Sequence, residues 1–345
     1  MLEKISPISL KEHIQRLIGL FHDGNVEEVI EEASLLLKQF PNSIGLYNVL
    51  GISYAKLERF DDAIKAYKSA IQIEPENPLA YFNLGVSLQD NQKLEEALKN
   101  YKIAISKKPG YFGAIYNAAG IYKQMGLFPS AIKYYKKALE LDTNYPPTYI
   151  NLALNHMSIG ELQAAIDYYK KACDFEFELA TTRLNLGVTL CEQGKYDECL
   201  AEIKAAVDLN LERISAHSNL FFILNYSDLP SEEIYSYYKR FDDIFSKKFS
   251  EMSEPHKFVK VKNKIKIGYV SADLCRHSVM RFIEPIFKNH DKEQFEIYAF
   301  AKLDKHDYMT HSIKSCCDGW IDTNHLSDEQ IAQKIRELGI DILID

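Results

Sequence analysis

A pattern that returns every 34 residues is the feature that most restricts how this chain can fold. Five copies run from residue 44 to residue 213, and the same places hold small or apolar residues in each copy. Four of these columns are Leu50, Leu84, Ala118, Leu152 and Leu186; Ala63, Ala97, Ala131, Ala165 and Cys199; Ala70, Ala104, Ala138, Ala172 and Ala206; and Tyr67, Tyr101, Tyr135 and Tyr169, with Ile203 in place of a fifth tyrosine. A repeat of this length encodes one supersecondary unit, so the chain is predicted to stack copies of that unit.

The residues that recur predict pairs of antiparallel helices, the tetratricopeptide type of repeat. A further column of Gly and Ala allows the two helices of a pair to approach closely, whereas the tyrosines fill the space between one pair and the next. Pro75 and Pro109 fall where a second helix would end, because proline cannot continue a helix interior. Residues 1–43 hold a looser sixth copy, as a capping repeat would. We therefore expect an α-solenoid with a long concave face that binds a partner.

An asparagine also recurs with the same period, always just before an apolar Leu or Ala of the pattern. The column is Asn83, Asn117, Asn151, Asn185 and Asn219. Asparagine is a mediocre helix former because its amide competes for the backbone, so its repetition within helices calls for a reason. The amide offers a donor and an acceptor, which an extended peptide backbone requires from a groove. The column therefore predicts a peptide-binding row. A ladder of hydrogen bonds between neighbouring repeats is the alternative, and the two roles are compatible.

The pattern changes after the repeats. Residues 214–263 are predicted to form a helical join and a charged linker. From 264 to 345, apolar runs alternate with helical patterns, and strands are expected at 265–272, 295–301, 319–323 and 340–344. The intervening helices are expected at 279–290, 307–317 and 327–339. This alternation predicts a parallel, Rossmann-like sheet. The expected fold class is thus an α-solenoid followed by a partial α/β segment.

The loop at 271–279 is the candidate site of the α/β segment, because ligands of such sheets bind beyond the carboxyl ends of the strands. The loop has no GxGxxG sequence, so the dinucleotide fingerprint is absent. It holds Asp273, Arg276, His277 and Ser278 close together. Among them, only His277 titrates near neutrality. His277 is therefore the candidate for proton transfer, and the alternative is a loop or capping histidine.

Composition and charge narrow the classes of function. The net charge of −8 lacks the basic footprint of a nucleic-acid binder. No apolar run has the length of a signal peptide core or a transmembrane helix, so no membrane association is expected. Six cysteines form no CxxC pair, which fits reduced thiols and a cytoplasmic location. Neither Cys316 and Cys317 nor His306 and His311 have matching partners, so no metal ion or prosthetic group is expected.

Two segments of the C-terminal part carry a resemblance to a known family. GYVSADLCRHSV (268–279) and GIDILID (339–345), placed after the repeats, resemble the O-linked N-acetylglucosamine transferases, both the bacterial type and the SPINDLY-like relatives. The resemblance extends over essentially the whole chain. It implies a metal-independent, inverting glycosyltransferase of the two-lobed GT-B architecture. Such enzymes move GlcNAc, or fucose in the SPINDLY branch, from a nucleotide sugar such as UDP-GlcNAc to Ser and Thr hydroxyls of proteins. The resemblance also implies that the asparagine groove holds the acceptor polypeptide and that His277 lies in the active site.

Two departures from the family pattern change this expectation. Gly319 stands where the family has a second active-site histidine, and glycine can neither transfer a proton nor donate a side-chain hydrogen bond. The second lobe, which builds most of the family's nucleotide-sugar site, does not follow Asp345. The chain is therefore expected to bind protein but to transfer little or no sugar unless a separate C-terminal lobe completes it. It would then be a fragment, a split gene product or a degenerate paralogue. A repeat scaffold with a vestigial α/β segment is the second hypothesis, and an autonomous nucleotide-binding domain with an adaptor arm is the third.

Overall fold

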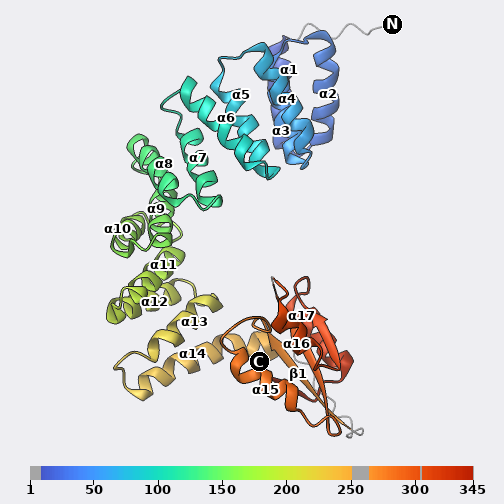
Figure 1. Cartoon of the computed structure of the whole chain (residues 1–345). Helices are drawn as coiled ribbons and strands as arrows, with labels where there is room; N and C mark the ends of the chain where they lie inside the picture. The colour runs from blue at the N-terminus through green and yellow to red at the C-terminus, as the bar shows by residue number, and fades with distance from the viewer. Residues whose placement is uncertain (1–8, 251–263, 304, 345) are drawn as a thin grey trace. The chain divides into compact units, whose positions relative to one another are not determined.

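The computed structural model describes residues 9–250, 264–303 and 305–344, which belong to two compact units. The units divide between residues 252 and 253, within the segment expected to be a linker. Residues 251–263 of that segment lie outside the described residues. Figure 1 shows stacked helices in the first unit and a small sheet with helices in the second.

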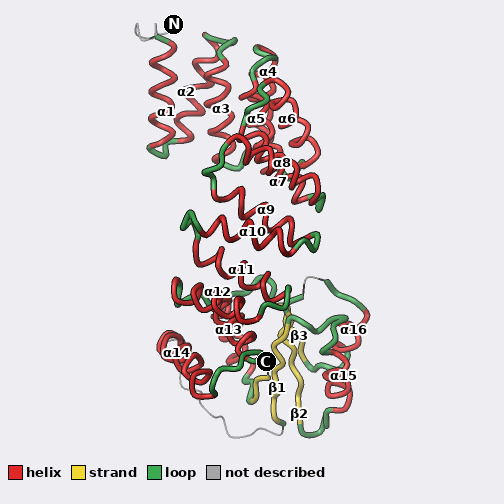
Figure 2. Tube along the Cα trace, turned by 90° about the vertical axis from the view of Figure 1, so that its left-hand side faces the viewer, coloured by secondary structure: helices red, strands yellow, loops and turns green. Residues whose placement is uncertain are grey.

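The first unit is a stack of helix pairs, as the period predicts (Figure 2). The first helices of the pairs are α1 (Leu10–His22), α3 (Ile44–Lys56), α5 (Pro78–Asp90), α7 (Phe112–Gln124), α9 (Pro146–Ser158), α11 (Leu179–Glu192) and α13 (Ile214–Leu224). The second helices are α2 (Val26–Gln39), α4 (Phe60–Ile73), α6 (Leu94–Lys107), α8 (Phe128–Leu141), α10 (Leu162–Cys173), α12 (Tyr196–Leu209) and α14 (Ser231–Ser250). The α-solenoid is thus confirmed, and α13 with α14 adds a pair after the five regular copies.

The repeated columns form the core of the stack. Every member of the column that begins with Ala63 is fully buried, and so is the ring of Tyr101. A Cβ atom built on Gly85 would lie 2.7 Å from Cε1 of Tyr101, closer than atoms can pack. Glycine at this place therefore lets the tyrosine of the second helix lie against the first helix of the same pair, which accounts for the column of small residues.

The first helices lie on the inner side of the stack. Each second helix contacts the first helix of the next pair. First helices also contact one another directly: α3 contacts α5, α5 contacts α7, and α11 contacts α13. In a curved stack the row of helices that approach one another more closely forms the inside of the curve. The asparagine column lies on first helices, and Asn151 of α9 contacts Tyr116 and Lys123 of the preceding first helix, which places it on the inner row of the stack.

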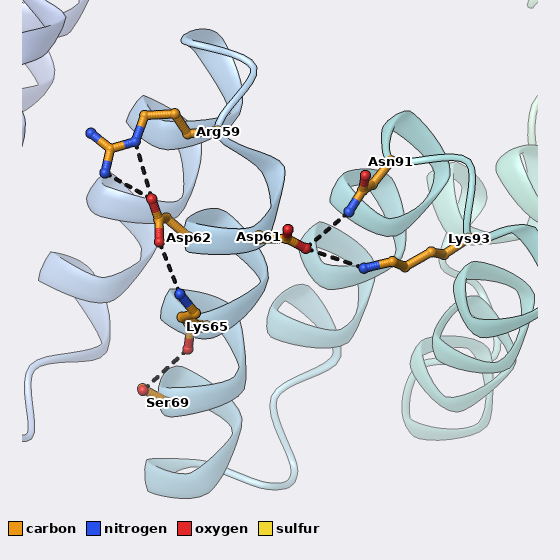
Figure 3. Close-up of polar contacts among 7 residues, drawn as sticks. All are labelled: Arg59, Asp61, Asp62, Lys65, Ser69, Asn91 and Lys93. Carbon is orange, nitrogen blue, oxygen red and sulfur yellow. Dashed lines mark hydrogen bonds and ion pairs between the residues drawn. The ribbon is translucent and has the colours of Figure 1, made fainter.

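Charged side chains also connect the pairs at the surface (Figure 3). Asp61 of α4 accepts hydrogen bonds from Nδ2 of Asn91 and Nζ of Lys93, both at 3.1 Å, across the boundary to the next pair. Asp62 accepts from Arg59 and Lys65 near the start of the same helix. These groups are largely exposed, so the contacts contribute little to the free energy of unfolding, and the stack depends on its buried columns.

The second unit is a parallel sheet with connecting helices. Its elements are β1 (Ile265–Ser271), α15 (Met280–Asn289), β2 (Phe295–Ala301), α16 (Tyr308–Lys314), β3 (Gly319–Asp322), α17 (Asp328–Leu338) and β4 (Ile342–Ile344). The strand order is β3-β2-β1-β4, and every pairing is parallel, as the alternation predicts. Ser327 caps α17 in a capping box, and Gly339 ends it at φ 63°.

Among the described residues, β4 is an edge strand of this sheet. It pairs with β1 on one side only, and its three side chains remain between 40% and 51% exposed. An edge strand with exposed Ile and Leu side chains offers unpaired backbone groups to another chain.

Candidate functional site

The asparagine column consists of half-buried side chains on five successive first helices. Asn83 lies on α5, Asn117 on α7, Asn151 on α9, Asn185 on α11 and Asn219 on α13. The structure thus places the whole column along the concave side of the first unit. The hydrogen bonds of its members differ, and this difference decides what each amide can still bind.

Asn151 is held by both neighbouring and local groups. Its Nδ2 donates to Oη of Tyr116 at 2.9 Å and to the carbonyl oxygen of Pro147 at 3.0 Å. Its Oδ1 accepts from Nζ of Lys123 at 2.8 Å. Tyr116 and Lys123 both belong to α7, so two of these bonds join successive repeats. Asn151 therefore takes part in the inter-repeat ladder that the sequence left as an alternative.

Asn117 contributes a weaker contact of the same kind. Its Nδ2 donates to Oη of Tyr101 on α6 at 3.3 Å, and Tyr101 in turn donates to Oε1 of Gln89 on α5 at 2.9 Å. This chain of bonds joins two successive repeats through a buried tyrosine. Within the described part of the chain, Oδ1 of Asn117 accepts no hydrogen bond, so its acceptor remains available.

Asn83, Asn185 and Asn219 have more free bonding capacity than Asn117 and Asn151. In the described ranges, no hydrogen bond involves the side chain of Asn83 or Asn185, and Nδ2 of Asn219 donates only to the carbonyl oxygen of Ser215, at 2.8 Å. A half-buried amide without a partner is costly unless water or a ligand satisfies it. These three side chains are therefore the best placed to bind the backbone of an extended peptide.

The groups around the column lie in a partly dry environment. Burial raises the pKa of Tyr116 to about 12 and lowers the pKa of Lys123, in each case because the charged form is poorly solvated. A partly dry groove strengthens hydrogen bonds to a bound backbone, since water competes less for the same groups.

The loop after β1 holds the four residues that the sequence singled out in the second unit. Oδ2 of Asp273 lies 3.7 Å from Nδ1 of His277, and both side chains are nearly half exposed. The backbone N–H of Val279 donates to the same Nδ1 at 3.4 Å. Nδ1 of His277 thus lies between a backbone N–H donor and a carboxylate. No hydrogen bond joins the side chains of Arg276 or Ser278 to His277 among the residues described.

Asp307 fixes this loop, and the sequence reasoning did not single it out. Its Oδ2 accepts from the backbone N–H of Arg276 at 2.7 Å, while its Oδ1 caps α16 by accepting from Met309 and Thr310. The backbone hydrogen bonds from Thr310 and Arg276 hold the pKa of Asp307 below its usual value. The D-x-x-T capping sequence at 307–310 was the available signal for the helix start, but nothing local indicated the contact with the β1 loop.

Gly319 lies beside Tyr298, its partner residue on β2. A Cβ atom on Gly319 would lie 2.5 Å from Cδ1 of the tyrosine ring. The ring therefore fills the space that a side chain at 319 would need. The hydroxyl of Tyr298 donates to Glu296, and Nζ of Lys266 lies 5.4 Å from the ring centroid, so neighbouring contacts hold the ring in place.

The described residues contain no group of three His, Cys, Asp or Glu side chains arranged to hold a metal ion. None of the helices in the described part of the chain combines the length and apolarity that crossing a bilayer requires.

Two parts of the chain match models of known protein families. Residues 242–345 match the glycosyl transferase family 41 model. Residues 51–92, 112–145, 146–178 and 179–208 match tetratricopeptide repeat models. The chain thus combines tetratricopeptide repeats with a C-terminal segment that is similar to glycosyl transferase family 41, in agreement with the resemblance found in the sequence.

Individual relatives are distant and match in part. The probable UDP-N-acetylglucosamine–peptide N-acetylglucosaminyltransferase SPINDLY of Arabidopsis thaliana is 32% identical over 85 residues, which is 24% of this chain and 9% of that protein. A mutant O-GlcNAc transferase of Thermobaculum terrenum is 24% identical over 68% of this chain and 45% of its own, with a TM-score of 0.49. The C-terminal part of a tetratricopeptide protein from Cytophaga hutchinsonii aligns with a TM-score of 0.60 at 16% identity, over 70% of this chain and all of its own. The last of these supports the solenoid fold alone.

Proposed function

We propose that this chain supplies the acceptor-binding arm and part of the first catalytic lobe of a protein O-glycosyltransferase. The reaction would move a sugar, N-acetylglucosamine in the first instance, from a nucleotide diphosphate donor to a Ser or Thr hydroxyl of an acceptor protein. The observation that carries the proposal is the joining of a family 41 segment to a helical stack whose concave side bears a row of asparagines. UDP-GlcNAc is the donor that the printed name of the Arabidopsis relative suggests.

The arm would bind the acceptor through its backbone rather than through particular side chains. Unpartnered amides on α5 and α11, and the free acceptor of Asn117 between them, offer donors and acceptors along the concave side. An extended polypeptide presents an N–H and a carbonyl at each residue, so a row of amides can hold many sequences. Asn151 would serve mainly to keep the row in place, because its own amide is already bonded.

His277 would act on the reacting groups from the loop after β1. The nearly half-exposed imidazole of His277 offers a ring N–H that can donate a hydrogen bond. Such a donor suits an oxygen of the donor sugar, its phosphates or the acceptor hydroxyl, and it helps to fix that oxygen before transfer. Asp307 would then be a positioning residue, since it holds the loop by its backbone.

A repeat scaffold without transferase activity is the second candidate, and the environment of Gly319 favours it. The ring of Tyr298 fills the space beside Gly319, the position where the family pattern has its second active-site histidine. A chain that lacks this histidine would keep the groove and its partners. Sugar transfer by the 345-residue chain alone is accordingly expected not to exceed that of a reaction without enzyme.

Two measurements test the proposal. Calorimetric titration of the chain with UDP and UDP-GlcNAc would give saturable heat in the micromolar range if the family 41 segment contributes a donor site, and no heat at millimolar ligand would favour the scaffold.

Binding of an unstructured, fluorescein-labelled Gly/Ser peptide would weaken about tenfold when Asn83 and Asn185 are both replaced by Ala, since each lost hydrogen bond is worth roughly 0.5–1.5 kcal/mol. Replacing the exposed Asn225 by Ala is the matched control. Unchanged affinity in the double variant would refute the role of the column.

A further inference from the structure

The proposed function leaves unexplained a cavity at the end of the asparagine row. It has a volume of about 310 Å³ and lies among α11, α12 and α13 of the first unit. Ile203 of α12 forms part of its wall, together with Cys191 of α11 and Asn219 of α13. A backbone that follows the asparagine column therefore passes this cavity where it reaches Asn219.

The cavity exists because one tyrosine of the repeat is missing. In an earlier repeat, the ring of Tyr101 fills the space between helix pairs, and its hydroxyl bonds to Gln89 and Asn117. Three repeats later, the places of these residues are held by Ile203, Cys191 and Asn219, in the same order. All three line the cavity. Isoleucine ends where the tyrosine ring would continue, so the space that a phenol fills elsewhere stays open here.

Aromatic rings form the rest of the wall. Tyr196, Phe222 and Tyr226 line the cavity and are 45%, 57% and 56% exposed. The rings of Tyr196 and Tyr226 stack with their centroids 5.6 Å apart, and Phe222 lies 5.3 Å from Tyr226. Three exposed aromatic rings around one opening are unusual on a surface that faces only water, and their faces carry negative charge density that attracts cations.

The polar groups of the cavity include a carboxylate and an amide oxygen, both of which accept hydrogen bonds. Glu192 brings a carboxylate to the wall, and within the described residues it forms no ion pair and no hydrogen bond. Nδ2 of Asn219 donates one hydrogen bond to the carbonyl oxygen of Ser215, and its Oδ1 accepts none within the described residues. A guanidinium group is planar, donates only, stacks on aromatic rings and pairs with carboxylates. The charge and chemistry of the wall thus fit arginine better than an uncharged side chain.

We propose that this cavity, lined by Glu192, Tyr196, Ile203, Asn219, Phe222 and Tyr226, binds an arginine side chain of the polypeptide in the groove. The inference rests on the proposed function, because the groove must first hold a polypeptide. The cavity would select one side chain of the acceptor, whereas the row of amides binds only the peptide backbone. Acceptors with an arginine at the matching distance from the modified residue would be preferred.

The test uses the full chain and four labelled peptides that differ at one place. Each is a Gly/Ser dodecapeptide with Arg, Lys, Phe or Ala at its centre, and its affinity is measured by fluorescence anisotropy at physiological salt. The Arg peptide is expected to bind about tenfold more tightly than the Ala peptide, and more tightly than the Lys and Phe peptides. Equal affinity of the Arg and Ala peptides, or tighter binding of the Phe peptide, would overturn the inference.

Two variants locate the effect at the cavity. Ile203→Tyr restores the tyrosine of the other repeats and should abolish the preference for arginine while the chain remains folded; Ile203→Leu, which leaves the cavity open, is its control. Glu192→Gln keeps the shape and should reduce the preference about fivefold, whereas Glu212→Gln, an equal change of charge outside the cavity, should leave it unchanged. A preference that survives Ile203→Tyr in a folded chain refutes the site.

The same data separate this inference from the proposed function. If all peptides bind equally and the Asn83 and Asn185 double variant weakens the binding of each, the peptide groove is supported and the arginine site is refuted. If the Arg peptide is preferred and Ile203→Tyr removes that preference, but the double variant leaves peptide affinity unchanged, the arginine site is supported and the role of the asparagine row is refuted. Absence of binding by any peptide overturns both.

Discussion

Replacing Asn151 by Ala separates the structural role of the asparagine column from its binding role. Asn151 joins α9 to α7 through Tyr116 and Lys123, whereas Asn185 occupies the same place one repeat later without a side-chain hydrogen bond in the described residues. Asn185→Ala is therefore the matched control. The two variants remove the same atoms from equivalent helices, so they differ only in the contacts that are lost.

The expected loss of stability follows from two inter-repeat hydrogen bonds. At about 1 kcal/mol for each, the loss is roughly 2 kcal/mol, and Ala regains about 0.5 kcal/mol through its better helix propensity. Asn151→Ala should thus lower the free energy of unfolding by about 1.5 kcal/mol. Asn185→Ala should leave it unchanged or raise it by a few tenths of a kcal/mol, since only the propensity term acts.

Urea denaturation followed by circular dichroism at the helix band measures this difference. With a slope of about 2 kcal/mol per molar urea, the midpoint of Asn151→Ala should fall by roughly 0.7 M. Repeat arrays can unfold in stages, so the slope must match that of the unchanged chain before midpoints are compared. Equal midpoints for the two variants would show that the bonds to Tyr116 and Lys123 do not stabilise the stack.

Three further predictions concern the remaining features. Gly319→His should destabilise the second unit by about 1–3 kcal/mol, because the new side chain must displace the ring of Tyr298. Thermal unfolding of that unit will measure the loss of stability. A combined Gly319→His and Tyr298→Ala variant should recover part of that loss. Burial raises the pKa of Tyr116 to about 12, so the folded state keeps a proton that the unfolded state loses near pH 10, and stability should fall as pH rises from about 10 to 12. The four buried tyrosines of the repeated column also have raised pKa values, so they lower the stability at high pH in the same way. Lys123 has a lowered pKa and would raise the stability over this range, but the tyrosines are more numerous. A urea midpoint that stays constant from about pH 10 to 12 would contradict the argument. Leu343→Lys at the exposed edge strand should reduce self-association in light scattering at high concentration, whereas Gln333→Lys, which adds the same single positive charge on α17, should not.

The repeats were predictable because their period encodes local structure. Each copy forms one helix pair, and the small residues recur because every pair must solve the same packing problem, as Gly85 and Tyr101 illustrate. The parallel sheet was also predictable from alternating apolar runs and from the caps at Ser327 and Gly339. The order of its strands was not, because nothing local states that β4 pairs with β1 rather than with β3.

The candidate binding and active-site residues were likewise predictable from the sequence only in part. Sequence alone located the asparagine column and the loop of His277, since residue type and spacing are visible in one dimension. It could not tell which amides are already bonded, because the partners of Asn151 come from another helix pair. Nor could it show that Asp307 ties down the His277 loop across 31 residues of chain.

The sequence by itself thus determined the repeating unit, the solenoid, the sheet class and the candidate residues, since each depends on local propensity or on a period. Tertiary structure alone decided which amides remain free, why no side chain fits at Gly319, and that Ile203 opens a cavity beside Asn219. Those properties depend on distances between side chains that lie far apart in the chain. A break in a repeated column is visible in the sequence, but only packing in three dimensions turns the missing ring into a space that a ligand can fill.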